Sequence, residues 1–231
     1  MSGRLPPTER VRVRRLPKRA AYDRATIDAI LDAALVAHLG FVVDGQPYVI
    51  PVLHARVGDD VLVHGSAASR AMRALAEGAP VCLTVTLLDG LVLARSAFHH
   101  SANYRSVVIL GRAVPVREAS EKLAALAAFT ERLVPGRWAE VRPPDARELR
   151  ATAVLRIPLA EASAKLRSGP AHDDPADLAR AAWAGVLPLA VRAGPPEQAA
   201  DLIPGTALDP SILHLLERFR GRRERRRPRA P

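Results

Sequence analysis

Short apolar segments rich in β-branched residues alternate with tight-turn signals through the middle of this 231-residue chain. The dipeptide Asp44-Gly45 interrupts residues 41–57 and predicts a hairpin, because Asp and Gly tolerate the backbone angles of two-residue turns. Residues 58–60 and Asp89-Gly90 predict further turns. The strands expected between the turns cover residues 61–65, 81–88, 91–94, 104–116 and 151–157. This pattern predicts a mainly β protein with an antiparallel sheet closed into a barrel.

Helical spacing of apolar residues is confined to segments around these strands. Helices are expected over residues 23–38, ended by Gly40, over 66–77, stopped by Gly78, over 119–133, and in pieces within 160–195. The chain therefore divides into an extended basic arm (1–19), a barrel domain with C-terminal helical elements (20–195), and a tail rich in proline, alanine and arginine (196–231). The composition of the tail predicts partial disorder.

The net charge of +10 is concentrated at the two ends. Residues 1–19 and 218–231 hold 15 of the 34 Lys and Arg residues but two of the 24 acidic ones, so residues 20–217 carry 19 basic and 22 acidic groups. A nucleic-acid-binding domain usually places its basic residues on a folded face. Binding to nucleic acid is therefore not expected, apart from weak nonspecific contact of the Arg-rich tail with RNA, DNA or anionic lipid.

No apolar run approaches the roughly 18–20 residues that span a bilayer, and no apolar segment follows the basic N-terminus as in a secretory signal. Cys82 is the single cysteine, which excludes an intrachain disulfide and a cysteine zinc cluster. A cytoplasmic protein without a membrane anchor is the simplest interpretation.

A candidate anion site follows the strand that ends at His64-Gly65. Ser66, Ser69 and Arg70 place two hydroxyl groups and a guanidinium at the start of a predicted helix. Helix N-termini attract anions, and arginine binds phosphate with two parallel hydrogen bonds. The alternative is an ordinary serine N-cap beside a surface arginine.

A second polar cluster, residues 95–106, precedes the apolar run at 107–110 and contains two histidines, two arginines, an asparagine and a tyrosine. Such groups are costly beside a core unless they meet a polar ligand or solvent. Histidines 54, 64, 99 and 100 match no metal-ligand spacing, and no nucleophile-elbow motif surrounds Ser66. A bound metal and a hydrolase are therefore disfavoured.

Three segments in this order resemble the pyridoxamine 5′-phosphate oxidase-like family, in particular its flavin-nucleotide-binding branch related to nitroimidazole reductases. They are Gly-Gln-Pro-Tyr-Val-Ile-Pro-Val at 45–52, His-Gly-Ser-Ala-Ala-Ser-Arg at 64–70, and the stretch from Asp89 to Arg112. The resemblance implies a split β-barrel that forms a homodimer and binds FMN between subunits. It predicts an FMN-dependent oxidoreductase of unknown substrate. The alternatives are a flavin-binding protein without turnover and a split barrel that uses deazaflavin or haem.

The resemblance also assigns site residues. Ser69-Arg70 match a phosphate-binding Ser-Arg-Lys segment in which Ala71 replaces the lysine, so Arg73 or Arg105 is expected to compensate. Arg105-Ser106 match an Arg-Gln pair of the family with serine replacing glutamine. The pyridoxal phosphate-binding pattern of the true oxidases is not visible, which disfavours oxidation of vitamin B6. The cofactor-binding residues expected are Val49, Ile50, Pro51, Val52, His64, Ser66, Ser69, Arg70, Asn103, Tyr104, Arg105, Ser106 and Trp183.

Two of these residues have a structural alternative. His64 is expected to face the flavin and to donate a proton in catalysis, because the reference pKa of histidine, about 6.5, suits proton transfer near neutrality. The alternative is a histidine held by hydrogen bonds at the barrel edge. Trp183 precedes Ala184-Gly185 and can stack on a flat ring, or it can cap the core.

Overall fold

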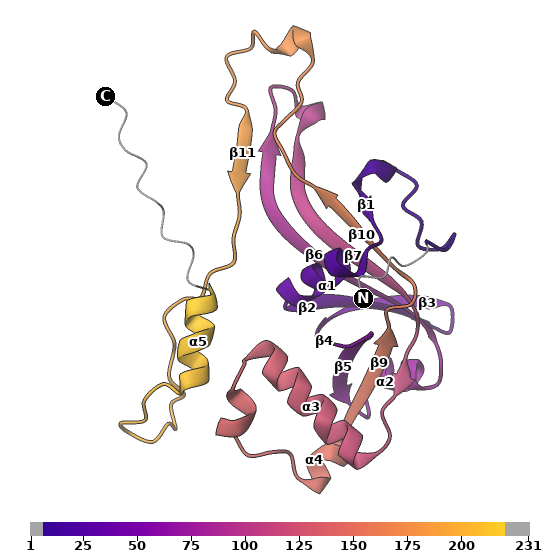
Figure 1. The fold of residues 1–231 in the computed structure, drawn as a ribbon, viewed down its shortest axis with the longest axis vertical. Coiled ribbons are helices and arrows are strands. Elements are labelled where there is room, and N and C mark those ends of the chain that lie inside the picture. The colour runs from indigo at the N-terminus through magenta and orange to yellow at the C-terminus, as the bar shows by residue number, and fades with distance from the viewer. Residues whose placement is uncertain (1–6, 220–231) are drawn as a thin grey trace.

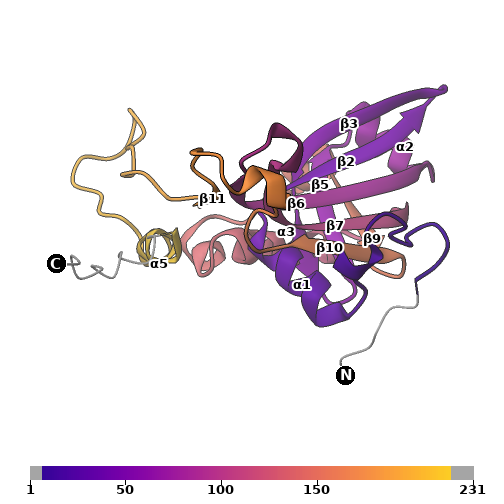
Figure 2. The same ribbon diagram turned by 90° about the horizontal axis from the view of Figure 1, so that it is seen from above.

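The computed structural model describes residues 7–219 and contains two antiparallel β-sheets (Figures 1 and 2). The seven-stranded sheet has the order β1-β10-β7-β6-β2-β3, with β11 paired to β6, and the four-stranded sheet has the order β4-β5-β9-β8. The strands are β1 (Ala20–Ala21), β2 (Val36–Val43), β3 (Gln46–Leu53), β4 (Ala55–Val57), β5 (Asp60–Ser66), β6 (Pro80–Leu93), β7 (Ser101–Arg112), β8 (Val114–Pro115), β9 (Thr152–Pro158), β10 (Ala162–Arg167) and β11 (Gly185–Pro188).

The helices lie around these sheets, and Figure 1 shows α3 and α4 beside the four-stranded sheet and α5 apart from it. The α-helices are α1 (Arg24–Ala33), α2 (Arg70–Ala76), α3 (Ala119–Leu133), α4 (Ala146–Ala151) and α5 (Pro210–Phe219). The short 3-10 helices are η1 (Pro17–Arg19), η2 (Ala97–His99), η3 (Arg137–Glu140) and η4 (Pro175–Asp177). The predicted mainly β fold with flanking helices is confirmed.

One hydrophobic core fills the space between the two sheets, α1 and α2. Ile27 of α1, Leu39 of β2, Val85 of β6 and Ile157 of β9 are completely buried in it. Burying a side chain of this size stabilises the fold by roughly 1.5–3 kcal/mol. This core fixes the ends of β3 and β5 relative to each other, and the predicted site residues of β3, β5 and α2 lie there.

The opposite side of the seven-stranded sheet, called the outer face here, is not covered by other described elements. The strand register places Pro51, His38, Thr84 and Val108 side by side on it, because paired residues of neighbouring strands point to the same side. Apolar side chains of this face are exposed to solvent, and they include Val36 (44%), Val42 (49%), Val49 (67%), Leu53 (46%) and Leu88 (48%).

The first predicted helix is shorter than expected. Asp23 caps it as predicted, accepting a hydrogen bond from the Thr26 amide at 2.8 Å, but α1 ends at Ala33. Residues 36–43 pair with both β3 and β6. The prediction that Gly40 ends the helix is wrong, because Gly40 lies inside β2, where a Cβ atom would come within 3.2 Å of the Cys82 carbonyl oxygen. Pairing on both sides overrides the helical spacing here.

The predicted turn at Asp89-Gly90 is also wrong. Strand β6 runs through it without interruption, and the register with β7 shifts between Leu88 and Gly90, which marks a β-bulge at Asp89. A Cβ atom at Gly90 would lie 2.9 Å from the Leu187 carbonyl oxygen of β11. The glycine is therefore explained by the close approach of β11 and not by a reversal of the chain.

Residues 160–195 contain β10 and β11 instead of the expected α-helical pieces. Ala162 and Ala164 are buried where β10 faces the core. Residues 210–219 of the predicted tail form helix α5, whereas residues 1–6 and the arginine cluster at 222–229 lie outside the described residues. None of the helices between residues 7 and 219 is both long and apolar enough to cross a bilayer.

Candidate cofactor site

The turn between β5 and α2 holds the predicted phosphate-binding residues. Ser66 ends β5 with an exposed side chain, and its carbonyl oxygen accepts a hydrogen bond from the Ser69 amide at 2.9 Å. Ser69 caps α2 through a hydrogen bond from the Met72 amide to its Oγ at 3.2 Å. The serine N-cap, which was the structural alternative to a phosphate site, is therefore present. Phosphate binding at this turn stays a prediction.

Arg70 is exposed at the first position of α2 and packs on an aromatic ring of the edge strand β3. Its Cζ atom lies 4.6 Å from the centroid of the Tyr48 ring, and Tyr48 stacks on Phe41 at 5.5 Å. Within residues 7–219, neither Arg70 nor Arg73 forms an ion pair. Both guanidinium groups are consequently free to bind an anionic ligand.

The predicted cofactor-binding residues 49–52 of β3 point alternately to the two sides of the sheet. Val49 and Pro51 are exposed on the outer face, whereas Ile50 and Val52 pack against the core. A strand's side chains alternate in this way, so four consecutive residues cannot all contact one ligand face. Ile50 and Val52 anchor the strand to the core. Val49 and Pro51 remain the candidates for contact with a cofactor.

His64 lies near the end of β5, half-buried on the side that faces α3. Its ring meets the ring of Phe129 edge-on, with centroids 4.4 Å apart. The Nδ1 atom is buried and has no hydrogen-bond partner. Burial lowers the pKa of His64, because the charged imidazolium is poorly solvated there. A neutral imidazole can bind a metal ion or exchange a proton, but the buried Nδ1 atom is closed to an external ligand in this conformation.

The predicted polar block is already paired within the subunit. Asn103 is buried and donates to the Gly169 carbonyl oxygen at 3.1 Å, and Arg167 donates to its side-chain oxygen. Arg105 forms two hydrogen bonds with Asp89, at 2.9 and 2.7 Å, which raise the pKa of Arg105. Arg105 is therefore not free to bind a phosphate. Of the two arginines predicted to replace the missing lysine at position 71, Arg73 is the one without an ion pair among the described residues.

Tyr104 and Ser106 of the same block lie on the outer face, in register with Leu88 and Thr86. The hydroxyl of Ser106 donates to the Lys165 carbonyl oxygen at 3.2 Å. These two residues share the outer face with Val49 and Pro51, so they are the members of the block that a ligand on that face can reach.

Trp183 lies far from the β5–α2 turn within one subunit. It is 67% exposed, and its ring covers Gly185, where a Cβ atom would come within 2.9 Å. Gly185 pairs with Leu93 of β6. At the other end of β6, Val81 pairs with Phe41 of β2, which in turn pairs with Tyr48 of β3. Twelve positions of β6 separate these levels, or on the order of 30–40 Å along the strand at about 3.3 Å per residue. One subunit does not bring Trp183 and Arg70 to one ligand.

The two adjacent histidines of the polar block, His99 and His100, contact different groups. His99 ends η2 and contacts Asp174 at 3.2 Å, and the Nδ1 atom of His100 accepts a hydrogen bond from the Ala94 amide at 3.0 Å. No group of three or more His, Cys, Asp or Glu side chains with metal-binding geometry occurs in residues 7–219.

Three residues around these sites were missed from the sequence. Tyr48 orients Arg70, Phe129 covers His64, and Asp89 binds Arg105. Tyr48 lies within the 45–52 segment that resembles the family, but its contact with Arg70 depends on the fold. Phe129 is 65 positions from His64 in the sequence, and no local pattern links the two.

The two antiparallel sheets around one core, with helices at their ends, define a mainly β split barrel. A family model described as pyridoxamine 5′-phosphate oxidase matches residues 23–166. The chain belongs to this family, as the sequence motifs indicated.

Two solved structures resemble this chain over most of its length. The flavocytochrome Anf3 from Azotobacter vinelandii is 44% identical and superposes with a TM-score of 0.85 over 90% of this chain and 97% of that one. The FAD- and haem-binding protein from Mycobacterium smegmatis is 40% identical, with a TM-score of 0.82 over 85% of this chain and 97% of that one.

A putative 5-nitroimidazole antibiotic resistance protein from Bacteroides thetaiotaomicron shares the fold at 20% identity, with a TM-score of 0.55 over 63% of this chain and 85% of that one. A comparison with curated proteins found no match.

Proposed function

We propose that this protein is a redox protein that binds FAD and haem, and that it acts as a homodimer. The observation that carries the proposal is its identity of 44% and 40% with two proteins named for a flavocytochrome and for FAD and haem binding. The sequence predicts FMN, with deazaflavin or haem as the alternative cofactors. These relatives favour FAD with haem over FMN alone.

The β5–α2 turn fits the phosphates of a flavin nucleotide. Arg70 and Arg73 carry no ion pair within the described chain, and Ser66 offers an exposed hydroxyl. Arginine and serine are common phosphate donors. When bound, a flavin supplies hydride and single-electron transfer, and the protein positions and tunes it. The chain's own part is to bind the phosphates at Arg70 and to hold that guanidinium against Tyr48.

His64 fits a ligand of the haem iron better than the other buried histidine. Both His64 and His54 have a buried Nδ1 atom without a partner. His54 is 2% exposed, and its Nε2 donates to the Leu31 carbonyl oxygen at 3.0 Å, so it is enclosed by its own subunit. His64 is half-buried and neutral near pH 7, and a neutral imidazole nitrogen is the form that binds iron.

The outer face supports a homodimer. Exposed valines and leucines of β3, β2 and β6 lie on it, and exposed apolar side chains gathered on one face commonly mark protein interfaces. Two predicted site residues on β3, Val49 and Pro51, and two on β7, Tyr104 and Ser106, share this face. A second copy can therefore bring together residues that one subunit keeps apart.

Cofactor analysis of the purified protein tests the proposal. Mass spectrometry of the released nucleotide is expected to identify FAD, and the absorption spectrum is expected to contain a haem Soret band. His64→Ala is expected to lose the haem band and to keep the flavin, with partial recovery of the band in added imidazole. His172→Ala, which removes an exposed loop histidine, is the matched control. FMN or deazaflavin as the single bound cofactor would refute the proposal.

A further inference from the structure

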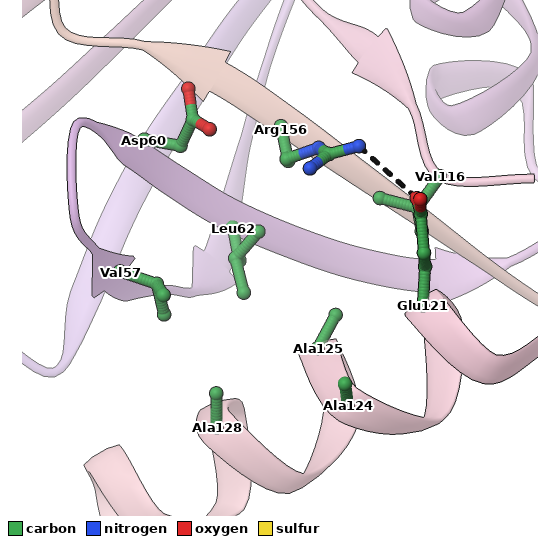
Figure 3. A pocket seen from close by; sticks show the side chains of 9 residues that line it. All are labelled: Val57, Asp60, Leu62, Val116, Glu121, Ala124, Ala125, Ala128 and Arg156. Carbon is green, nitrogen blue, oxygen red and sulfur yellow. Dashed lines mark hydrogen bonds and ion pairs between the residues drawn. The ribbon is translucent and has the colours of Figure 1, made fainter.

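A pocket of about 330 Å³ lies between α3 and the four-stranded sheet, and Figure 3 shows its lining. Its volume falls at the lower end of the range for small-molecule sites. The pocket is lined by Val57, Asp60, Leu62, Val116, Glu121, Ala124, Ala125, Ala128 and Arg156. The three alanines belong to α3, and their short side chains leave the space between helix and sheet unfilled.

The floor of this pocket is apolar and fixed. Leu62 of β5 is 4% exposed, and Val116 after β8 is also 4% exposed. Leu62 and Arg156 are directly paired across β5 and β9, so both project from the same side of the sheet toward α3. An apolar molecular body is therefore the kind of group that this floor accommodates.

The polar groups of the pocket leave one negative charge without a partner. Arg156 forms an ion pair with Glu121 at 3.3 Å, drawn as a dashed line in Figure 3, and this pair is locally neutral. The half-buried carboxylate of Asp60 has no hydrogen bond or ion pair with any side chain between residues 7 and 219. A ligand cation would supply the missing partner.

We propose that this pocket binds a small organic cation, an ammonium group carried on an apolar body. The ammonium group binds the carboxylate of Asp60, and the apolar body lies between Leu62 and the alanines of α3. The site is at the beginning of β5, whereas the predicted phosphate turn follows the end of that strand. The inference therefore does not depend on the flavin assignment.

The test compares three probes of similar shape on the holoprotein: phenethylamine, the uncharged phenethyl alcohol and the anionic hydrocinnamate. Binding is followed by the amide chemical shifts of Leu62 and Ala124 in isotope-labelled protein. Phenethylamine is expected to bind with a dissociation constant on the order of 1 mM, about tenfold tighter than the alcohol, because a charge-assisted hydrogen bond forms. Tighter binding of hydrocinnamate, or no shift at these amides with millimolar phenethylamine, would overturn the proposal.

Variants locate the two parts of the site. Asp60→Asn is expected to remove the preference for the amine and to leave the affinity for the alcohol unchanged. Ala124→Leu, at an exposed position, is expected to fill the pocket and weaken both probes at least about tenfold. Asp44→Asn is the control, because it neutralises an exposed carboxylate outside the pocket and asparagine tolerates the φ of 50° there. A preference for the amine that survives Asp60→Asn would refute the assignment even if Ala124→Leu does not fold.

Discussion

The guanidinium of Arg70 lies over the ring of Tyr48, with 4.6 Å between Cζ and the ring centroid. Tyr48 belongs to the edge strand β3, and Arg70 begins α2, so this contact joins two elements at the turn where the phosphate site is predicted. A cation held against an aromatic face keeps its N–H groups directed outward, and such contacts contribute about 0.5–1 kcal/mol at exposed positions. This geometry leaves the exposed Arg70 guanidinium at the turn where anion binding is proposed.

Arg70→Ala is expected to raise the dissociation constant of the flavin nucleotide at least about tenfold, because a charge-assisted hydrogen bond to phosphate is lost. Flavin fluorescence titration measures the change. Arg192→Ala is the control, since Arg192 is an exposed arginine in the segment before α5. Equal flavin affinities of the Arg70→Ala and unmodified proteins would disprove the phosphate assignment.

Gly90→Ala is expected to destabilise the protein by about 1–3 kcal/mol, because the added methyl group overlaps the Leu187 carbonyl oxygen at 2.9 Å. Hydrogen exchange of the β11 amides is expected to accelerate, and urea unfolding reports the loss of stability. Gly111→Ala is the matched control, since a Cβ atom there meets nothing within 4 Å in a strand of the same sheet. Similar stabilities for the two variants would contradict the explanation of Gly90 by the close approach of β11.

Leu53→Asp on the outer face is expected to convert a dimer into monomers, because a charge would be buried in an apolar interface. Sedimentation velocity measures the change in mass, and the far-ultraviolet circular dichroism is expected to stay the same. Ile203→Asp changes a side chain that is 76% exposed in the segment before α5 and serves as the control. A Leu53→Asp protein that sediments like the unmodified one would exclude this face as the interface.

Stability is expected to decrease with acid because of His54. Its Nε2–H donates to the Leu31 carbonyl oxygen, so a second proton would reside on the buried, unpartnered Nδ1. Burial lowers the pKa of His54 in the folded state, whereas the unfolded histidine titrates near about pH 6.5. The unfolded chain therefore binds more protons below about pH 6.5, and stability present above that pH is lost as the pH falls.

His54→Gln is expected to reduce the loss of unfolding free energy between about pH 7.5 and pH 5.5, by up to about 1.4 kcal/mol per pH unit. Glutamine can keep the hydrogen bond to Leu31 without titrating. Urea unfolding at the two pH values measures the effect, with His172→Gln as the control for an exposed loop histidine. An unchanged pH dependence in His54→Gln would assign the acid sensitivity to other groups.

The sequence by itself determined the hairpin at Asp44-Gly45, the Asp23 cap, the helix over 119–133 and the family. Each depends on residues close together in the chain, or on the order of motifs. Asp44 and Gly45 do take positive φ angles of 50° and 77°, and α3 spans Ala119–Leu133. The same local rules gave a turn at Asp89-Gly90 and a helix through Val36, where pairing with distant strands decides the conformation.

Tertiary structure alone decided which predicted residues are available to a ligand. Arg105 and Asn103 are polar residues in a suggestive motif, but Asp89 and Arg167 already satisfy them. Phe129 approaches His64 because α3 packs across β5, a contact that no sequence spacing encodes. Local sequence sets backbone preference and side-chain chemistry. Whether a polar group stays unpaired depends on the long-range packing that surrounds it.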